Sequence, residues 1–381
     1  MLFQIDRSIA NLFTSGSPTS LDVAGLRYLV LGSSEGNHKI TGQRKTLREL
    51  AQAQSVDSHT RNALTRAVTQ VYQDGNLFCK LRVVGQVVAD TQTAPLSSSN
   101  GMQRVITLPL RWFDSSAKIQ PTVLLGENSS DANVFLKMGE VGTILTDLGY
   151  VPVVARCTHG GGNTTGTVLD QTVQSGQLCL CIVDSDKKSP SGPSGGTAQA
   201  VTPYKNAQSY PLAHVEETVG RDLENSLPDL FYVDAYGGHP SYSSLAELLM
   251  ALSSAGEVDV RNHLDIENGL KLYDLFSLTP GTRDFTFWQS KLDSVIKMMK
   301  LSSGSLPCLS IKICSQQIRA TCTCILVPPN RANILNEFLQ RYQNADRYKL
   351  RAALDDSVRP EWLRLGSLIA AWCCADPKMR L

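Results

Sequence analysis

The spacing of apolar and polar residues changes near residue 120. Before that point, apolar residues recur mostly at helical spacing. The segments with this spacing are 21–32, 46–54 and 59–75. Two strand-like runs follow, at 76–90 and 105–113, with a polar loop at 91–101. The pattern predicts a mixed, mainly helical N-terminal region over residues 1–115.

From residue 120, buried strands and helices are expected to alternate. Continuous apolar runs predict strands at 121–127, 150–157 and 177–186. Amphipathic segments predict helices between them, at 130–149 and 167–176. The order β-α-β-α-β is typical of an α/β fold with a parallel sheet flanked by helices, whose functional residues follow the carboxyl ends of the strands.

The last third is less regular but mainly helical. Helical spacing occurs at 214–228, 243–256, 287–301, 331–343 and 360–374, and strand-like runs at 308–314 and 321–327. We therefore expect a second domain over residues 116–381, with a helical C-terminal extension from about residue 240.

The amino-acid composition indicates a globular protein and excludes several other classes. With 42% hydrophobic residues and a net charge of +1, the chain is of ordinary globular type and is not a generally basic nucleic-acid coat protein. No run of 18 apolar residues suggests a membrane span. The start of the chain lacks the basic residues of a signal peptide and contains Asp6. The ten cysteines include no Cys-x-x-Cys pair. We expect buried, reduced thiols without metal-ligand spacing, in a cytoplasmic protein.

Acidic residues follow two of the expected strands. Glu127 closes the first strand and Asp131 comes four residues later, whereas Asp184 and Asp186 close the third. Carboxylates gathered at one sheet edge repel one another, and hard divalent cations offset that charge. The pattern thus predicts a site for one or two Mg²⁺ or Mn²⁺ ions. The alternative is that these acids cap helices or face solvent.

A glycine-rich turn, Gly160-Gly161-Gly162-Asn163, precedes the second helix of this region. Backbone N–H groups at a helix start, without side chains in the way, suit a phosphate. We therefore expect these four residues to bind phosphate, with a plain tight turn as the alternative interpretation.

Several motifs together resemble one family. The segment 126–131 (GENSSD) resembles the Glu-Gly-x-x-Asp motif of the Toprim family, and 183–186 (VDSD) resembles its Asp-x-Asp motif. Further segments are similar to nuclease-type Toprims of the overcoming-lysogenization-defect group and related phage-defence effectors: 160–163, 221–228, 264–270 and the helix 362–374. The resemblance covers residues 120–381.

This resemblance implies a Toprim-like fold and metal-dependent cleavage of phosphodiester bonds. It adds Glu224, within the Arg-x-x-Glu-Asn-x-Leu segment, to the expected metal ligands. Glu267 stands where such chains carry a lysine, so Lys271 is the expected catalytic lysine, with Lys187 and Lys188 as alternatives. A lysine there would stabilise charge on the scissile phosphate.

We expect a nuclease acting on DNA or RNA, including tRNA, as an effector of bacterial anti-phage defence. The main alternative is a non-catalytic Toprim-like module that binds nucleic acid or a partner as a sensor. A primase or topoisomerase subunit is disfavoured because the chain has no visible zinc ribbon. Since no P-loop motif is present, a separately encoded ATPase or sensor protein is a candidate partner. Residues 1–115 would dock it, or form a homo-oligomer.

Overall fold

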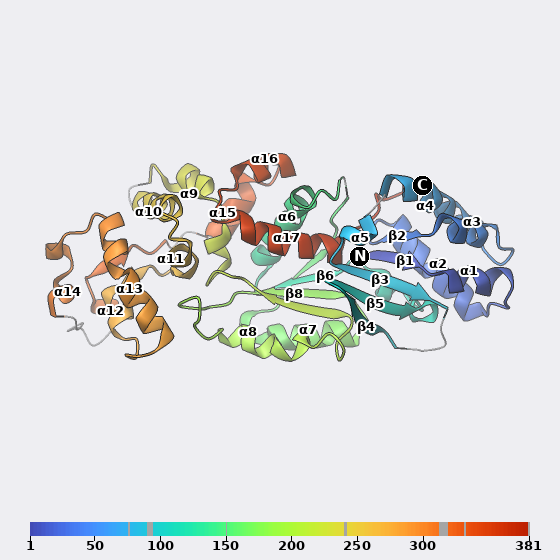
Figure 1. The fold of residues 1–381 in the computed structure, drawn as a ribbon, viewed down its shortest axis with the longest axis horizontal. Coiled ribbons are helices and arrows are strands. Elements are labelled where there is room, and N and C mark those ends of the chain that lie inside the picture. The colour runs from blue at the N-terminus through green and yellow to red at the C-terminus, as the bar shows by residue number, and fades with distance from the viewer. Residues whose placement is uncertain are drawn as a thin grey trace. The chain divides into compact units, whose positions relative to one another are not determined.

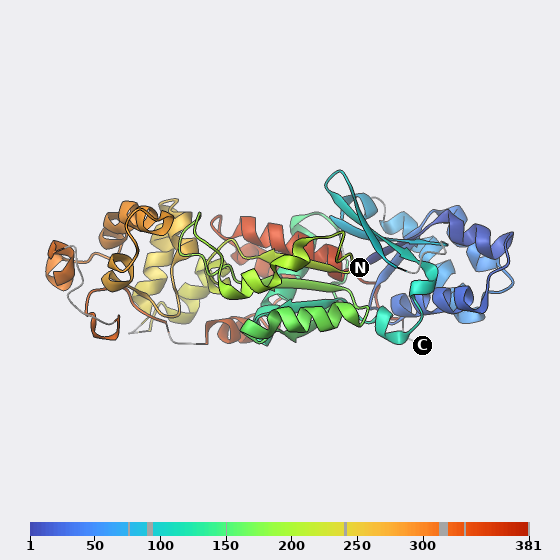
Figure 2. The ribbon, with the colours of Figure 1, turned by 90° about the horizontal axis from the view of Figure 1, so that it is seen from below.

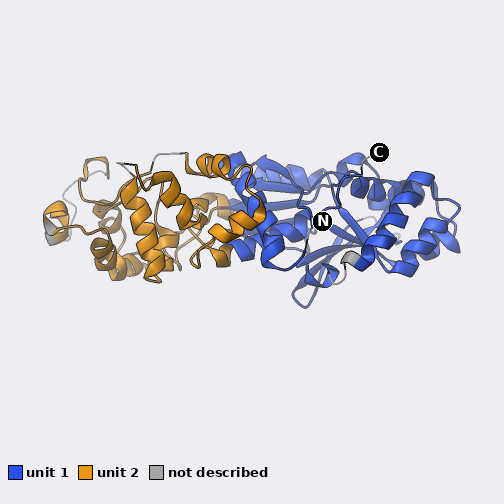
Figure 3. Cartoon of the chain, turned by 90° about the horizontal axis from the view of Figure 1, so that it is seen from above, with its two compact units in different colours: residues 1–183, 200–216, 362–381 blue, residues 184–199, 217–361 orange. Residues whose placement is uncertain are grey.

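The architecture is that of a computed structural model, which describes residues 1–74, 77–89, 94–149, 151–239, 242–311, 319–330 and 333–379. The chain divides into two compact units (Figure 3). Unit 1 comprises residues 1–183, 200–216 and 362–381, and unit 2 comprises residues 184–199 and 217–361. The expected boundary between residues 115 and 116 thus falls inside unit 1, between two sheets.

The first sheet of unit 1 has five strands in the order β2-β1-β3-β5-β4. They are β1 (Leu2–Ile5), β2 (Lys39–Gly42), β3 (Val83–Val88), β4 (Leu96–Asn100) and β5 (Gln103–Pro109). All neighbouring strands are parallel except β4 and β5, whose hairpin projects from the rest of the sheet (Figure 2). The helices of this region are α1 (Arg7–Thr14), α2 (Ser20–Ser34), α3 (Arg44–Gln52), α4 (Ser58–Asp74) and α5 (Leu77–Lys80).

The second sheet has the order β7-β6-β8-β9. Its strands are β6 (Val123–Gly126), β7 (Arg156–His159), β8 (Cys179–Val183) and β9 (Ala213–Glu217). Both β7 and β8 pair with β6 in parallel. Figure 1 shows α7 (Thr165–Gln174) on one face and α6 (Ser129–Leu145) with α17 (Arg359–Cys373) on the other. Coverage on both faces explains why β6 and β8 are buried along their whole length. The expected α/β sheet is confirmed.

Arg104 of β5 joins the two sheets of unit 1. Its guanidinium donates hydrogen bonds to the carbonyl oxygens of Tyr210, Pro211 and Ala213, at 3.2, 2.9 and 3.0 Å. It also lies over the ring of Trp372 in α17, 5.5 Å from the ring centroid. One side chain therefore satisfies several carbonyls at the edge of the second sheet.

Unit 2 is mainly helical. Its helices include α9 (Asp229–Tyr236), α10 (Ser243–Ser254), α11 (Val258–His263), α12 (Leu272–Phe276), α13 (Arg283–Met298), α14 (Pro307–Ile311), α15 (Ile334–Arg341) and α16 (Arg347–Ala353). The unit also contains a two-stranded antiparallel sheet, formed by β10 (Leu270–Lys271) and β11 (Ile325–Val327). In the described part of the whole chain, no helix combines the length and apolar character needed to cross a bilayer.

Two expected elements are wrong, and two more hold only in part. The helix expected at 214–228 is instead strand β9 followed by the 3₁₀ turn η5 (Leu223–Ser226), and the buried residues Ala213 and Val215 alternate as in a strand. The strand expected at 308–314 begins as helix α14, and residues 312–314 lie outside the described residues. Within 76–90 the structure has α5 and then β3, and the loop expected at 91–101 contains β4.

Candidate active site

Two neighbouring strands of the second sheet are each followed by an acid. In their parallel pairing, Leu125 of β6 lies opposite Cys181 of β8. Glu127 comes directly after β6, and Asp184 directly after β8. Chain connections from β6 run first to β7 on one side and then to β8 on the other, so the order reverses between β6 and β8. In open α/β sheets, ligands bind beyond the carboxyl ends of the strands at such a reversal.

Asp131 is built into the turn between β6 and α6. Its carboxylate accepts the backbone N–H of Asn128 at 2.9 Å, and the Asn128 side chain accepts the backbone N–H of Asp131 at 3.1 Å. This reciprocal capping box begins α6. Burial raises the pKa of the Asp131 carboxyl to about 6, although these hydrogen bonds oppose the rise. Asp131 therefore has a structural role here, and its role as a metal ligand stays a prediction.

The glycine-rich turn lies beside the end of β6. The backbone N–H groups of Gly160 and Gly161 donate to the carbonyl oxygens of Gly126 and Glu127, at 2.8 and 2.9 Å. These bonds continue the β6–β7 pairing past the strand ends. Both N–H groups thus have backbone acceptors in this structure, and phosphate binding by Gly160 and Gly161 stays a prediction. The same holds for Gly162 and Asn163, the other two residues of the predicted phosphate site.

The segment with Asp184 and Asp186 belongs to unit 2 and is tied to a neighbouring loop there. The backbone N–H of Asp186 donates to the Arg221 carbonyl at 2.8 Å. The hydroxyl of Ser185, between the two acids, donates to the Gly220 carbonyl at 2.7 Å. Asp186 has a left-handed backbone, with φ of 54°. These contacts hold residues 185–186 against the loop at residues 220–221 within unit 2.

Acidic side chains gather around Asp186 within unit 2. Burial raises the pKa of the Asp222 carboxyl to about 7. Arg221 lowers that pKa, while the negative charges of Asp265, Asp186 and Glu267 raise it. The Arg221 guanidinium pairs with the Asp265 carboxylate at 2.7 Å. Neither Asp222 nor Asp265 is among the site residues predicted from the sequence, although both lie inside the segments 221–228 and 264–270 that resemble family motifs.

Glu224 and Lys271 are also in unit 2. Glu224 is part of η5, and its carbonyl oxygen accepts the Tyr232 hydroxyl at 2.8 Å. The Lys271 ammonium donates to the carbonyl oxygens of Arg319 and Cys322, at 3.1 and 2.9 Å. Lys271 therefore supports the β10–β11 region as the structure stands. The metal role of Glu224 and the catalytic role of Lys271 stay predictions.

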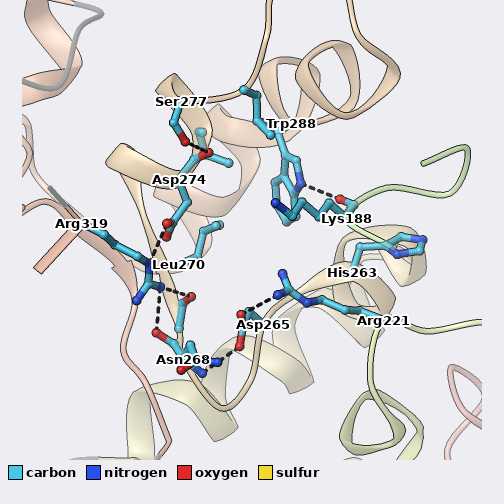
Figure 4. A pocket seen from close by; sticks show the side chains of 13 residues that line it. Lys188, Arg221, His263, Asp265, Asn268, Leu270, Asp274, Ser277, Trp288 and Arg319 are labelled. Atoms are coloured by element: carbon cyan, nitrogen blue, oxygen red, sulfur yellow. Dashed lines mark hydrogen bonds and ion pairs between the residues drawn. The ribbon is translucent and has the colours of Figure 1, made fainter. Parts of the chain in front are cut away.

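A polar cavity of about 370 Å³ opens in unit 2 (Figure 4). Basic, acidic and aromatic side chains line it, among them Lys188, Arg221, His263, Asp265, Trp288 and Arg319. The Trp288 indole N–H donates to the Lys188 carbonyl at 2.7 Å, and Arg319 pairs with Asp274 at 2.6 Å. The cavity is thus lined by two arginines that pair with acids, Arg221 with Asp265 and Arg319 with Asp274, and by Lys188, which follows the Asp-x-Asp segment. No sequence pattern predicts this cavity, because its lining is spread over residues 188–319.

A second group of potential metal ligands is formed by cysteines. The Sγ atoms of Cys308, Cys322 and Cys324 all lie within 4.8 Å of one another. Among the described residues of unit 2, no three carboxylates have oxygens that all lie within 4.8 Å of one another. The spacing of these cysteines along the sequence is not that of a metal site, as predicted, yet the fold brings the three thiols together. The cysteines of the described residues are free of disulfides, as expected.

Comparison of the chain with protein-family models, with curated proteins and with solved structures found no match. The functional interpretation therefore rests on the motifs and on the geometry described above.

Proposed function

We propose that this protein is a metal-dependent nuclease with a Toprim-like fold, which cleaves phosphodiester bonds in DNA or RNA. The observation that carries the proposal is the direct pairing of β6 with β8 at the point where the strand order reverses. Glu127 and Asp184 follow these two strands in the chain. The order of motifs along residues 120–381 supports the same reaction class and a role as an effector of anti-phage defence.

The donor atoms fit Mg²⁺ or Mn²⁺. All the side chains concerned offer carboxylate oxygens, which hard divalent cations prefer. The residues that would hold one or two ions are Glu127, Asp131, Asp184, Asp186 and Glu224. Burial, and after it the negative charge of Asp265, raise the pKa of the Asp186 carboxyl. A bound cation would relieve this crowding of negative charge. Such an ion supplies charge stabilisation at the phosphate and a more acidic water.

Basic side chains of unit 2 would hold the nucleic acid. Arg221, Lys188 and Arg319 line the cavity beside the Asp-x-Asp segment. A guanidinium offers a planar pair of donors that matches phosphate oxygens. The net charge of +1 means that attraction of the polyanion must come from such local groups rather than from the whole surface. Binding would orient one phosphate toward the acids that follow β8.

The test is a cleavage assay with the full chain on single- and double-stranded DNA, RNA and tRNA. We expect cleavage with Mg²⁺ or Mn²⁺ and none with EDTA. Glu127→Gln keeps the size and polarity of the side chain but removes its charge, and should reduce cleavage on the order of 10²-fold or more. Glu140→Gln is the matched control, because Glu140 lies on α6 and pairs with Lys137 at 3.0 Å.

The alternative function predicts a different outcome. If the chain binds nucleic acid equally well with and without the metal and never cleaves it, the non-catalytic sensor module is the better description. Cleavage that survives intact in Glu127→Gln would place the reaction elsewhere in the chain.

A further inference from the structure

Three buried cysteines converge within unit 2. Cys308 lies in α14, and Cys322 and Cys324 lie just before β11. Their exposed fractions are 5%, 2% and 0%, and their Sγ atoms lie within 4.8 Å of one another. The proposed nuclease chemistry uses none of them. Among the described residues, these three cysteines form the one group of potential metal ligands whose ligand atoms lie so close together.

Backbone groups orient the three thiols. The N–H of Leu272 donates to the Cys324 carbonyl at 3.0 Å, which fixes Cys324 against the β10–β11 pair. The N–H of Cys308 donates to the Cys324 Sγ at 3.4 Å. A hydrogen bond donated to sulfur stabilises the thiolate, the form that binds metals.

Positive charge lies next to the cluster. The Lys271 ammonium is 2.9 Å from the Cys322 carbonyl oxygen and is held there by a second carbonyl, that of Arg319. The Arg319 guanidinium is a second cation nearby: its pKa is raised chiefly by the hydrogen bond with Asp274 and to a smaller extent by Cys322. Nearby cations favour ionised sulfur. They also offset the net negative charge of a divalent cation bound by three thiolates.

We propose that Cys308, Cys322 and Cys324 bind a structural Zn²⁺ ion, separate from the ions of the nuclease site. Soft thiolates select zinc over Mg²⁺ or Mn²⁺. Tetrahedral zinc with Zn–S bonds of about 2.3 Å separates two sulfurs by roughly 3.8 Å, which lies within the observed limit of 4.8 Å. Each thiol loses its proton to solvent on binding, and the fourth tetrahedral position takes a further ligand.

Zinc would hold together a part of unit 2 that has little sheet structure. The β10–β11 pair is two-stranded, and such a pair is marginal unless something else secures it. An ion shared by α14 and the start of β11 joins two segments that are 14 residues apart in the chain, from Cys308 to Cys322. The metal therefore contributes folding free energy rather than chemistry on substrate.

The test measures zinc in the purified full chain after dialysis against a weak chelator. We expect about one Zn²⁺ per chain. Replacement by Co²⁺ should give the visible absorption of tetrahedral cobalt together with a thiolate charge-transfer band. Cys322→Ser and Cys324→Ser should each lose most of the zinc. Cys179→Ser is the matched control, because Cys179 is equally buried but lies in β8 of unit 1.

Thiol labelling tests the proposal without any substitution. In the wild-type chain, added Zn²⁺ should slow alkylation of these three cysteines and leave the exposed Cys79 unaffected. The proposal is overturned by equal labelling rates with and without Zn²⁺, by unchanged zinc content in Cys324→Ser, or by a disulfide between two of the three cysteines. None of these readouts depends on nuclease activity, so the two proposals can fail separately.

Discussion

Lys39 and Asp376 form a buried ion pair between the first sheet and the C-terminal residues of unit 1. The Lys39 ammonium lies 2.9 Å from the Asp376 carboxylate, and the side chains are 6% and 3% exposed. Asp376 also accepts the Ser33 hydroxyl at 2.6 Å. Close by, the N-terminal amine of Met1 donates to the Cys374 carbonyl at 2.7 Å. The two ends of the chain therefore stabilise one another.

Removing one partner of this pair should be costly. Asp376→Ala leaves the Lys39 ammonium buried without its carboxylate, and we expect a loss of about 3–5 kcal/mol in the free energy of unfolding. Denaturation with urea, followed by circular dichroism, measures it. Asp356→Ala is the control, because the Asp356 side chain is fully exposed beside Arg359 and should change stability by less than about 1 kcal/mol. Equal effects for the two variants would contradict the role of burial.

Acid should weaken the start of α2. Hydrogen bonds from Arg111 lower the pKa of the Asp22 carboxyl to about 2, and Asp22 also completes the capping box with Thr19. Since this pKa is below that of an unfolded aspartate, the stabilisation is present near neutral pH. It is lost as the pH falls from about 5 toward 2.

Asp22→Asn should therefore cost roughly 1–2 kcal/mol near neutral pH and much less near pH 2. The measurement is the urea midpoint of the wild type and the variant across this pH range. A difference between the two chains that does not depend on pH would show that the ion pair with Arg111 is not its source.

Helices α6 and α17 pack through two glycines. A Cβ added at Gly142 would lie 2.7 Å from the Cα of Gly366, and one added at Gly366 would lie 2.5 Å from the Met138 carbonyl oxygen. Gly142→Ala should destabilise the chain by about 1–3 kcal/mol, because the helices must move apart. Thermal unfolding checks this. Gly196→Ala, at the start of α8 (Gly196–Val201), should be tolerated, since nothing lies within 4 Å of its added Cβ.

These glycines illustrate how far the sequence could predict the fold. Apolar runs and helical spacing located β6, α6, β8 and α17 to within a few residues, because these elements are buried or amphipathic by themselves. The same patterns cannot show that Gly142 and Gly366 meet, since that contact depends on packing. At residues 214–228, pairing in the sheet overrode a helix-like charge pattern, and β9 formed instead.

The candidate site, like the fold, was predictable from the sequence only in part. Strand-end acids such as Glu127 and Asp184 were predictable from the order of elements alone, because parallel neighbours end at one edge. The approach of Asp222 to Asp265, and of Cys308 to Cys324, joins segments far apart in the chain. No spacing rule contains such contacts, so only the folded chain reveals them.

Asp184→Asn should abolish metal-dependent cleavage without unfolding the protein. The substitution removes one negative charge from the segment that follows β8, where the neighbouring Asp186 already has a raised pKa because of burial. The metal-free fold should therefore be as stable as the wild type or slightly more so. Activity should fall on the order of 10²-fold or more, because a lost carboxylate weakens binding of the ion that the reaction needs.

Two measurements separate this chemical role from a structural one. Thermal unfolding of Asp184→Asn with EDTA should match that of the wild type, whereas added Mn²⁺ should raise the melting temperature of the wild type more than that of the variant. Asp234→Asn is the matched control, because Asp234 is an exposed aspartate on α9 of the same unit, and it should keep full activity and the full response to Mn²⁺. A large drop in melting temperature for Asp184→Asn with EDTA would mean that this carboxylate holds the fold together. Cleavage at the wild-type rate would show that Asp184 is not a metal ligand. The pairing of β6 with β8 would then no longer support the proposed nuclease site.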